Sequence, residues 1–351
     1  MSTVRVLVVD DSPLVRELLS DVLERHPRIL VVDTASDPYQ AREKIKRHDP
    51  DVLTLDVEMP RMDGLTFLRN LMRLRPMPVV MVSVLTEGGA RATMDALALG
   101  AVDFVLKPRS DLSNTLEEYA EELHSKVLAA AEARTANLAP RRPPSAREGG
   151  SSPKLVESTQ RIIAIGASTG GTEAIKAVVG GLPPDAPGIV IGLHIPPVFS
   201  RSFAQRLDLH SAMRVSEAED GQVVVPGHAY VAPGDSHLRL RREGGQFVCR
   251  LGQDPPVSRH RPSVDVLFSS VAESVGTYAL GTLLTGMGKD GAQGLLEMRR
   301  AGAATAAQDE ATSVVWGMPG EAVRLGAAGA VVPLGGMGEW LLEALAMGQG
   351  A

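Results

Sequence analysis

Short apolar runs alternate with helical patterns from Val4 to about Ala131, and this alternation limits the fold more than any other feature. Apolar strands separated by helices are typical of a doubly wound parallel sheet. The pattern predicts five strands, at Val4–Asp10, Ile29–Thr34, Val52–Asp56, Val79–Ser83 and Asp103–Leu106. Helices are predicted to begin near Pro13, Pro38, Leu65, Ala90 and Leu116.

Polar side chains stand at the ends of four of these strands, where ligands bind in open parallel sheets. Asp10 and Asp11 follow the first strand, Asp56 ends the third, Ser83 ends the fourth and Lys107 follows the fifth. Three converging carboxylates suit a hard dication such as Mg²⁺. A helix-capping role explains any one of these acids, as with Asp11 before the first helix. Together with Lys107, however, the set predicts phosphoryl transfer to Asp56, which would form an acyl phosphate.

A second α/β pattern follows a stretch in which the apolar period disappears and Pro, Arg, Gly and Ser dominate. Such a composition is typical of a solvated linker. Beyond it the pattern predicts buried strands at Arg161–Gly166, Pro187–His194 and Tyr278–Thr285, and helices at Thr172–Val179, Ser200–Leu209 and Ala292–Ala301. The β-like pieces between Val223 and Leu251 cannot be arranged from the sequence. We therefore predict an α/β protein of two doubly wound domains with mainly parallel sheets, at residues 4–128 and 159–347, joined by a linker at 129–158.

Charge and cysteine content exclude several classes of protein. The formal net charge of −6 lacks the basic excess of a nucleic-acid binder, and no basic recognition helix follows the linker. A DNA-binding response regulator is therefore not expected. The single cysteine, Cys249, cannot form an internal disulfide. Because neither a signal-peptide pattern nor an apolar run of transmembrane length is present, we expect a cytoplasmic protein that is not an integral membrane protein.

A glycine-rich turn connects the first strand of the second domain to a helix, in the segment Gly166-Ala167-Ser168-Thr169-Gly170-Gly171. This strand, turn and helix context predicts an exposed serine nucleophile, Ser168, at a helix N-terminus. Taken alone, the same turn equally suits a phosphate or a dinucleotide. A Rossmann dehydrogenase fits poorly, because the second glycine of its fingerprint is missing.

Two further residues at the same edge of the predicted sheet favour a serine hydrolase. His194 ends one strand, and Asp290 follows another through a short loop. A serine nucleophile needs a base, and the base needs an orienting carboxylate. An α/β-hydrolase would have the chain order Ser, Asp, His, so that fold is not predicted. The other histidines of this domain that compete as the base are His210, His228, His237 and His260, of which the last two lie in loops that are able to line the cleft.

The first domain resembles the response-regulator receiver domains, as in CheY, over Val4 to about Leu128. The resemblance includes Met59-Pro60 and Gly64 after the acceptor aspartate. It implies that Ser83 is the switch hydroxyl that reports the phosphate together with Lys107. It also implies that a Mg²⁺ ion is held by Asp10, Asp11, Asp56 and the backbone carbonyl of Glu58.

The second domain resembles the CheB-type methylesterase family from about Arg161 to Leu334. The motifs that carry the resemblance are Gly166–Gly171, His194-Ile195-Pro196-Pro197, Arg261–Asp265, Thr285–Gly291, Ala307–Glu310 and Gly317-Met318-Pro319. The resemblance implies that Ser168 attacks a glutamate γ-methyl ester, or a glutamine amide, while His194 takes its proton and Asp290 orients the imidazole. Backbone N–H groups of Thr169 and Met287 are the candidates for the oxyanion hole, and ester hydrolysis needs no cofactor.

The two resemblances together imply a role in chemotaxis adaptation. The expected partners are methylated chemoreceptors (methyl-accepting chemotaxis proteins) as substrates and a CheA-type histidine kinase as the phosphodonor. Phosphorylation of Asp56 is expected to shift an equilibrium so that the receiver no longer covers the esterase cleft. The alternative is an interaction protein whose second domain keeps the fold without turnover, and a fluorophosphonate label on Ser168 would separate the two.

Overall fold

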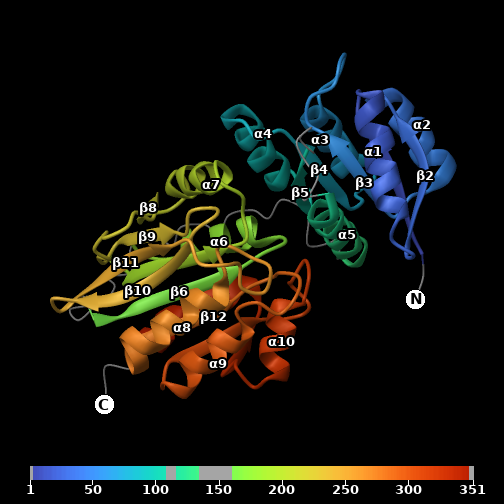
Figure 1. The fold of residues 1–351 in the computed structure, drawn as a ribbon. Coiled ribbons are helices and arrows are strands. Elements are labelled where there is room, and N and C mark those ends of the chain that lie inside the picture. The colour runs from blue at the N-terminus through green and yellow to red at the C-terminus, as the bar shows by residue number, and fades with distance from the viewer. Residues whose placement is uncertain (1–2, 108–115, 134–159, 348–351) are drawn as a thin grey trace. The chain divides into compact units, whose positions relative to one another are not determined.

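The computed structural model describes residues 3–107, 116–133 and 160–347. The chain divides into two compact units, Met1–Arg141 and Arg142–Ala351, coloured blue to teal and green to red in Figure 1. Each unit is built on a parallel sheet with helices, so the predicted fold class is confirmed. Helix α5 continues to Glu132, four residues into the predicted linker, and the rest of that segment lies outside the described residues except for Ala133.

The first unit has the strand order β2-β1-β3-β4-β5. Its strands are β1 (Val4–Val9), β2 (Ile29–Ala35), β3 (Val52–Asp56), β4 (Val79–Ser83) and β5 (Asp103–Leu106). Its helices are α1 (Pro13–Glu24), α2 (Pro38–His48), α3 (Gly64–Leu74), α4 (Glu87–Ala98) and α5 (Leu116–Glu132). The chain runs from β1 outward to β2 and then back to β3 on the other side of β1. Such a reversal opens a crevice at the carboxyl ends of β1 and β3, where Asp10 and Asp56 stand.

Side-chain caps set the starts of helices α1 to α4. Helix α1 is capped by Ser12 rather than by Asp11, which leaves the Asp11 carboxylate available to the crevice. Helix α4 begins three residues before the predicted Ala90, because Thr86 Oγ1 accepts a hydrogen bond from Gly89 N at 3.0 Å.

The second unit has a seven-stranded parallel sheet of order β14-β13-β12-β6-β7-β9-β8 and a separate antiparallel hairpin, β10-β11. The strands of the sheet are β6 (Ile162–Ala167), β7 (Gly188–Leu193), β8 (Arg214–Glu217), β9 (His228–Val231), β12 (Ala279–Leu283), β13 (Ala304–Gln308) and β14 (Ala330–Val332). The hairpin strands are β10 (His237–Glu243) and β11 (Gln246–Gly252). The β-like segments between Val223 and Leu251 therefore form two different elements. One of them, β9, joins the sheet, and the others form the β10-β11 hairpin.

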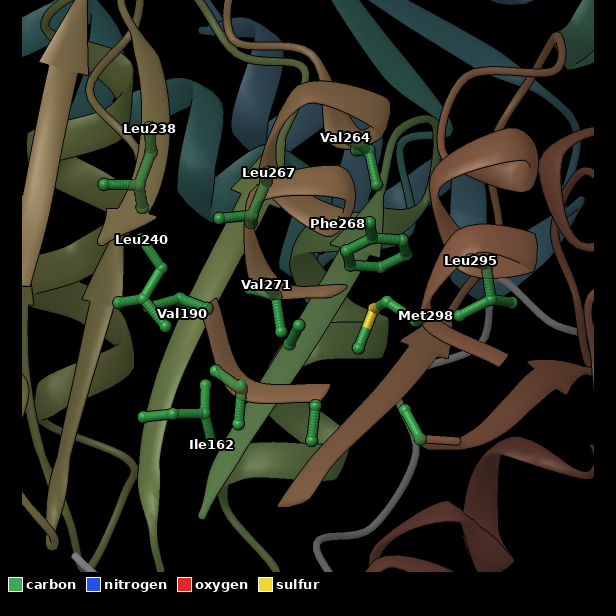
Figure 2. Packing of buried hydrophobic residues seen from close by; sticks show 14 of the residues in the cluster. Ile162, Val190, Leu238, Leu240, Val264, Leu267, Phe268, Val271, Leu295 and Met298 are labelled. Carbon is green, nitrogen blue, oxygen red and sulfur yellow. The ribbon is translucent and has the colours of Figure 1, made fainter. Parts of the chain in front are cut away.

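Helix α8 (Val264–Val275) organises the core of the second unit and is absent from the helices predicted from the sequence. The other helices are α6 (Gly171–Val179), α7 (Phe199–Asp208), α9 (Ala292–Arg300), α10 (Met318–Arg324) and α11 (Met337–Met347). Figure 2 shows the side chains of Val264, Leu267, Phe268 and Val271 between the central strands, the hairpin and α9. Each such buried side chain contributes about 1.5–3 kcal/mol. This packing fixes the first turn of α8 at the carboxyl edge of the sheet.

None of the helices within the described residues is both long and apolar enough to cross a bilayer.

Candidate active site

The structure brings three predicted acids of the first unit together. Asp10, Asp11 and Asp56 each offer a carboxylate oxygen within 4.8 Å of the others. Lys107 Nζ lies 2.9 Å from Asp10 Oδ2 and 2.8 Å from Asp56 Oδ2. A cavity of about 490 Å³ adjoins the acids, and Asp11 and Glu58 are among its lining residues. Hard carboxylate oxygens beside an open cavity fit a divalent cation that keeps several waters.

Burial and mutual repulsion leave the Asp56 carboxylate poorly stabilised. Burial raises the pKa of Asp56 from 3.8 to about 6, the hydrogen bond from Lys107 opposes the rise, and the charge of Asp10 adds to it. Burial also disfavours the charged form of Lys107, but hydrogen bonds to Asp56 and Asp10 outweigh it and raise the pKa of the ammonium. Two buried carboxylates therefore share the single positive charge of Lys107, and a divalent cation beside them would favour their ionised forms.

The Ser83 side chain is buried and forms hydrogen bonds with helix α4. Its Oγ lies 2.8 Å from Thr93 Oγ1 and 3.4 Å from Gly89 O, both on that helix. Sequence reasoning missed Thr93, since a threonine inside a helix carries no signal of its own. The contact gives Ser83 a direct hydrogen-bonded connection to α4.

Asp56→Asn is expected to raise the stability of the protein in metal-free buffer near neutral pH by about 2 kcal/mol. The folded state binds the Asp56 proton more tightly than the unfolded state, since the pKa is raised to about 6. The parent protein therefore loses stability as the pH rises from about 4 to about 6. Thermal unfolding with a chelator should show a higher Tm for the variant above about pH 6 and a smaller difference below about pH 4.

Asp21→Asn, which changes an exposed carboxylate of α1, is the matched control and should leave Tm unchanged. Added Mg²⁺ is expected to raise the Tm of the parent more than that of Asp56→Asn. A variant that unfolds at a lower temperature than the parent in chelator would contradict the electrostatic argument.

The predicted hydrolase residues lie just beyond the carboxyl ends of three adjacent strands of the second unit. Ser168 follows β6, His194 follows β7 and Asp290 lies in the loop after β12, and β6 is hydrogen-bonded to both of its neighbours. The chain reverses direction at β6, so this edge is the switch point of the sheet, where ligands bind. Backbone bonds connect the three loops, from Ser168 N to Thr285 O at 3.0 Å and from His194 N to Ala167 O at 3.3 Å.

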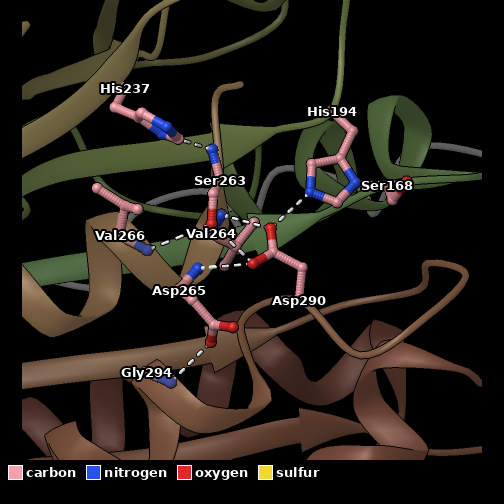
Figure 3. Close-up of polar contacts among 9 residues, drawn as sticks. All are labelled: Ser168, His194, His237, Ser263, Val264, Asp265, Val266, Asp290 and Gly294. Atoms are coloured by element: carbon pink, nitrogen blue, oxygen red, sulfur yellow. Dashed lines mark hydrogen bonds and ion pairs between the residues drawn. The ribbon is translucent and has the colours of Figure 1, made fainter. Parts of the chain in front are cut away.

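The three side chains form one hydrogen-bonded series (Figure 3). His194 Nδ1 lies 3.1 Å from Ser168 Oγ, and His194 Nε2 lies 2.7 Å from Asp290 Oδ2. An ionised carboxylate accepts but does not donate, so the ring proton lies on Nε2. The Nδ1 lone pair therefore faces the serine hydroxyl. This arrangement is able to remove the hydroxyl proton and to stabilise the resulting imidazolium.

The first turn of α8 stabilises the Asp290 anion. Burial alone would raise the pKa of Asp290, but hydrogen bonding to His194, the charge of His194 and hydrogen bonds from Ser263 and Val264 lower it to about 2. The free N–H groups at a helix N-terminus favour a negative charge there. Neighbouring Asp265 behaves differently: burial raises its pKa to about 6, against a hydrogen bond from Gly294 N.

Glycines permit the close approach of the loops around Ser168. Gly170 has φ +75°, a conformation that other residues rarely adopt, and it is the N-cap residue of α6. A Cβ on Gly286 would lie 2.9 Å from Ser168 Cβ and 2.3 Å from Met318 Sδ. The loop after β12 therefore passes against the nucleophile only because residue 286 lacks a side chain.

The two oxyanion candidates flank this close approach. Thr169 is buried and follows Ser168 directly, and Met287 follows Gly286. The N–H groups of Ser168 and Gly286 are already bonded, to Thr285 O and Val315 O respectively. The roles of Thr169 and Met287 in an oxyanion hole stay predictions.

The competing histidines separate into two groups. His210 and His228 bond elsewhere, to Arg206 O and to Ser216 Oγ. His260 stacks on the catalytic candidate, with its ring 3.6 Å from that of His194 and an interplanar angle of 13°. His237 is fully buried and accepts a hydrogen bond from Ser263 N at 3.2 Å.

Sequence reasoning missed the residues of the α8 first turn that hold Asp290. A signal was present, because Ser263 directly precedes an apolar periodic segment, as an N-cap residue does. The motif Arg261–Asp265 contributed to the resemblance, but no role had been assigned to its members.

Two family models match separate parts of the chain. The model described as CheB methylesterase matches residues 163–341, and the model described as response regulator receiver domain matches residues 6–117. The solved catalytic domain of Thermotoga maritima CheB methylesterase is 38% identical, covers 52% of this chain and 97% of that domain, and superposes with a TM-score of 0.51.

Curated relatives match along nearly the whole chain. Protein-glutamate methylesterase/protein-glutamine glutaminase 1 of Xanthomonas campestris pv. campestris is 57% identical over 345 residues, which cover 97% of this chain and 96% of the relative. The protein of the same name from Hahella chejuensis is 56% identical over 336 residues, which cover 94% of this chain and 93% of the relative. The chain therefore belongs to the CheB methylesterase family and carries a response-regulator receiver domain ahead of its methylesterase domain.

Proposed function

We propose that Ser168, His194 and Asp290 carry out the reaction of a protein-glutamate methylesterase/protein-glutamine glutaminase on chemoreceptors, in chemotaxis adaptation. As a member of this family the chain is a carboxylic ester hydrolase. The observation that carries the residue assignment is the hydrogen-bonded series from Ser168 Oγ through His194 to Asp290, at the ends of three adjacent strands. The substrates are glutamate γ-methyl esters and the corresponding glutamine amides.

In the acylation step, His194 Nδ1 takes the hydroxyl proton of Ser168 while Oγ bonds to the ester carbonyl carbon. The imidazolium lies against Asp290, which is ionised because its pKa is about 2. Backbone N–H groups of Thr169 and Met287 donate to the carbonyl oxygen as it becomes negative. His194 then returns the proton to the leaving oxygen, and methanol departs. With an amide the leaving group is ammonia.

In the deacylation step, His194 takes a proton from water, and the hydroxide bonds to the acyl carbon. The bond to Ser168 Oγ breaks, Oγ regains the proton from His194, and the glutamate carboxylate is released. His260 covers one face of His194 throughout, because the two rings are stacked.

The receiver domain is proposed to regulate this reaction through phosphorylation of Asp56. A CheA-type histidine kinase supplies the phosphoryl group from a phosphohistidine. An Asp56 carboxylate oxygen bonds to the phosphorus while the phosphorus–nitrogen bond breaks, and the kinase histidine is the leaving group. A Mg²⁺ ion held by Asp10, Asp11, Asp56 and the Glu58 carbonyl supplies charge neutralisation when bound. Lys107 neutralises a phosphoryl oxygen, and Ser83 transmits the change to α4 through Thr93. This assignment places the protein in the cytoplasm with the kinase and the cytoplasmic part of the receptors.

Asp56→Asn is expected to remove the stimulation of esterase activity by a small phosphodonor such as acetyl phosphate. The amide cannot form the acyl phosphate, so the unstimulated rate should persist with and without donor. The measurement is methanol release from methylated receptor membranes, in buffer containing Mg²⁺. Asp21→Asn keeps the acceptor and should respond as the parent does.

The same assay tests the function itself. Methanol release by the parent supports a receptor methylesterase, and its absence at every phosphodonor concentration would reject it. Full stimulation of the Asp56→Asn variant would leave the esterase assignment intact and would reject gating through Asp56.

A further inference from the structure

We infer that Ser263 is a positioning residue of the esterase reaction, and that its hydroxyl group holds the Asp290 carboxylate in the orientation that His194 requires. The inference rests on the proposed function of Ser168, His194 and Asp290. Ser263 directly precedes α8 and is 1% exposed. Its described hydrogen bonds go to His237, Asp290 and residues of α8, and not to Ser168 or His194, so its action is through Asp290.

Both oxygens of Asp290 are fully engaged (Figure 3). Oδ1 accepts from Ser263 Oγ at 2.7 Å and from Asp265 N at 3.1 Å. Oδ2 accepts from Val264 N at 2.7 Å and from His194 Nε2 at 2.7 Å. A carboxylate has about four lone-pair sites, so these four donors saturate it. Among the described donors to Asp290, Ser263 is the one hydroxyl group.

The geometry makes Ser263 the stronger constraint on Oδ1. Its 2.7 Å contact has the usual length of an O–H···O bond, whereas the 3.1 Å contact of Asp265 N is longer than is usual for an N–H···O bond. Rotation of the carboxylate about its Cβ–Cγ bond would move Oδ2 away from His194. Donors on Oδ1 oppose this rotation, and the hydroxyl is the shorter of the two.

A hydrogen bond to the β10-β11 hairpin holds Ser263 in place. Its N–H donates to His237 Nδ1 at 3.2 Å, and His237 Nε2 lies 3.2 Å from Pro255 O. His237 begins β10 and is fully buried, so it is a fixed anchor. A continuous series of contacts therefore runs from the hairpin through His237, Ser263, Asp290 and His194 to the nucleophile.

Removal of the hydroxyl is expected to lower kcat about 10- to 100-fold and to leave KM within about twofold. Misplacement of a catalytic group by about 1 Å costs roughly 100-fold in rate without loss of substrate contacts. Ser263→Ala removes the donor, and Ser263→Thr keeps it. The Thr variant should therefore retain kcat within about threefold of the parent.

Ser263 also caps α8, since its Oγ accepts from Val266 N at 3.4 Å. Ser263→Gly separates the two roles, because glycine is a tolerated N-cap residue but has no hydroxyl. We expect the Tm of Ser263→Gly to lie closer to the parent value than the Tm of Ser263→Ala does. The kcat of Ser263→Gly should be as low as that of Ser263→Ala. If kcat follows Tm across the Ala, Gly and Thr variants, the role of Ser263 is structural and the inference is wrong.

Ser270→Ala is the matched control, since Ser270 is a buried serine of the same helix. Its hydroxyl donates to Leu267 O at 2.7 Å and accepts from Leu240 N at 2.9 Å, away from Asp290. This variant should have a lower Tm than the parent and the same kcat. A loss of kcat equal to that of Ser263→Ala would show that any buried serine of α8 has the same effect, and would overturn the inference.

The rate of Ser168 labelling by a fluorophosphonate separates this inference from the proposed function. Labelling needs an activated serine but no receptor. Slow labelling in Ser263→Ala and Ser263→Gly, with parent-like labelling in Ser270→Ala, supports positioning even if receptor membranes release no methanol. Parent-like labelling in both Ser263 variants would overturn the inference while leaving the esterase function standing.

Discussion

Ser168→Ala is expected to lower methanol release from methylated receptor membranes by at least about 10⁴-fold. The alanine has no atom that can bond to the ester carbonyl carbon, so no acyl-enzyme forms. The 2.7 Å bond between His194 and Asp290 should remain, because it does not involve the serine hydroxyl. Residual turnover would come from the oxyanion donors and substrate binding alone.

The control for this experiment is Ser211→Ala, which removes a serine hydroxyl of the same unit that accepts from Met213 N at 3.0 Å. It should release methanol at the parent rate. Phosphorylation of Asp56 should be unchanged in Ser168→Ala, since the receiver chemistry uses other residues. Release within about tenfold of the parent would reject Ser168 as the nucleophile, and fluorophosphonate labelling of Ser168→Ala would lead to the same conclusion.

Asp290→Asn is expected to lower kcat by about 10⁴-fold while the protein stays folded. The amide nitrogen would face one of the donors that now bind the carboxylate. The favoured imidazole tautomer then carries its proton on Nδ1, toward Ser168, and can no longer accept the hydroxyl proton. The loss of the anion also removes the stabilisation of the imidazolium, and this term is large because Asp290 is 2% exposed.

The measurement for Asp290→Asn is the rate of methanol release together with the rate of fluorophosphonate labelling. Both should fall, because labelling also needs the base. Asp265→Asn is the informative comparison, since its carboxylate accepts from Gly294 N at 2.7 Å and interacts with Asp290, whose charge helps to raise the Asp265 pKa. This variant should lose much less activity than Asp290→Asn, because the carboxylate beside His194 remains. If Asp290→Asn retained more than about a tenth of the parent rate, His194 would not depend on Asp290 for its tautomer.

Much of the fold could be predicted from local patterns. The bounds predicted for the strands that became β3, β4 and β5 coincide with those in the structure. These strands are short, mainly apolar runs bounded by turn residues, and their middle positions are all buried. Strand ends also placed Asp10, Asp56 and Lys107 at one edge of the sheet, since parallel strands all present the same end there.

Other parts of the fold depend on contacts that no local pattern contains. Helix α8 has its apolar residues at helical spacing over Val264–Val275, so the helix itself has a local signal, but its docking position has none. The assignment of β9 to the sheet and of β10 and β11 to a hairpin likewise depends on partners far along the chain. Helix α8 makes extensive contact with β10 and α9, and these contacts decide its position.

The sequence alone determined that a serine, a histidine and an aspartate end strands at one edge of the second sheet, because glycines and apolar runs mark those ends locally. Only the tertiary structure decided that β6 lies between β7 and β12, which brings the three loops together. It also decided that the first turn of α8 surrounds Asp290 with donors from Ser263, Val264 and Asp265. Strand order and helix docking follow from long-range burial of apolar surface, which is a property of the assembled core and not of any segment.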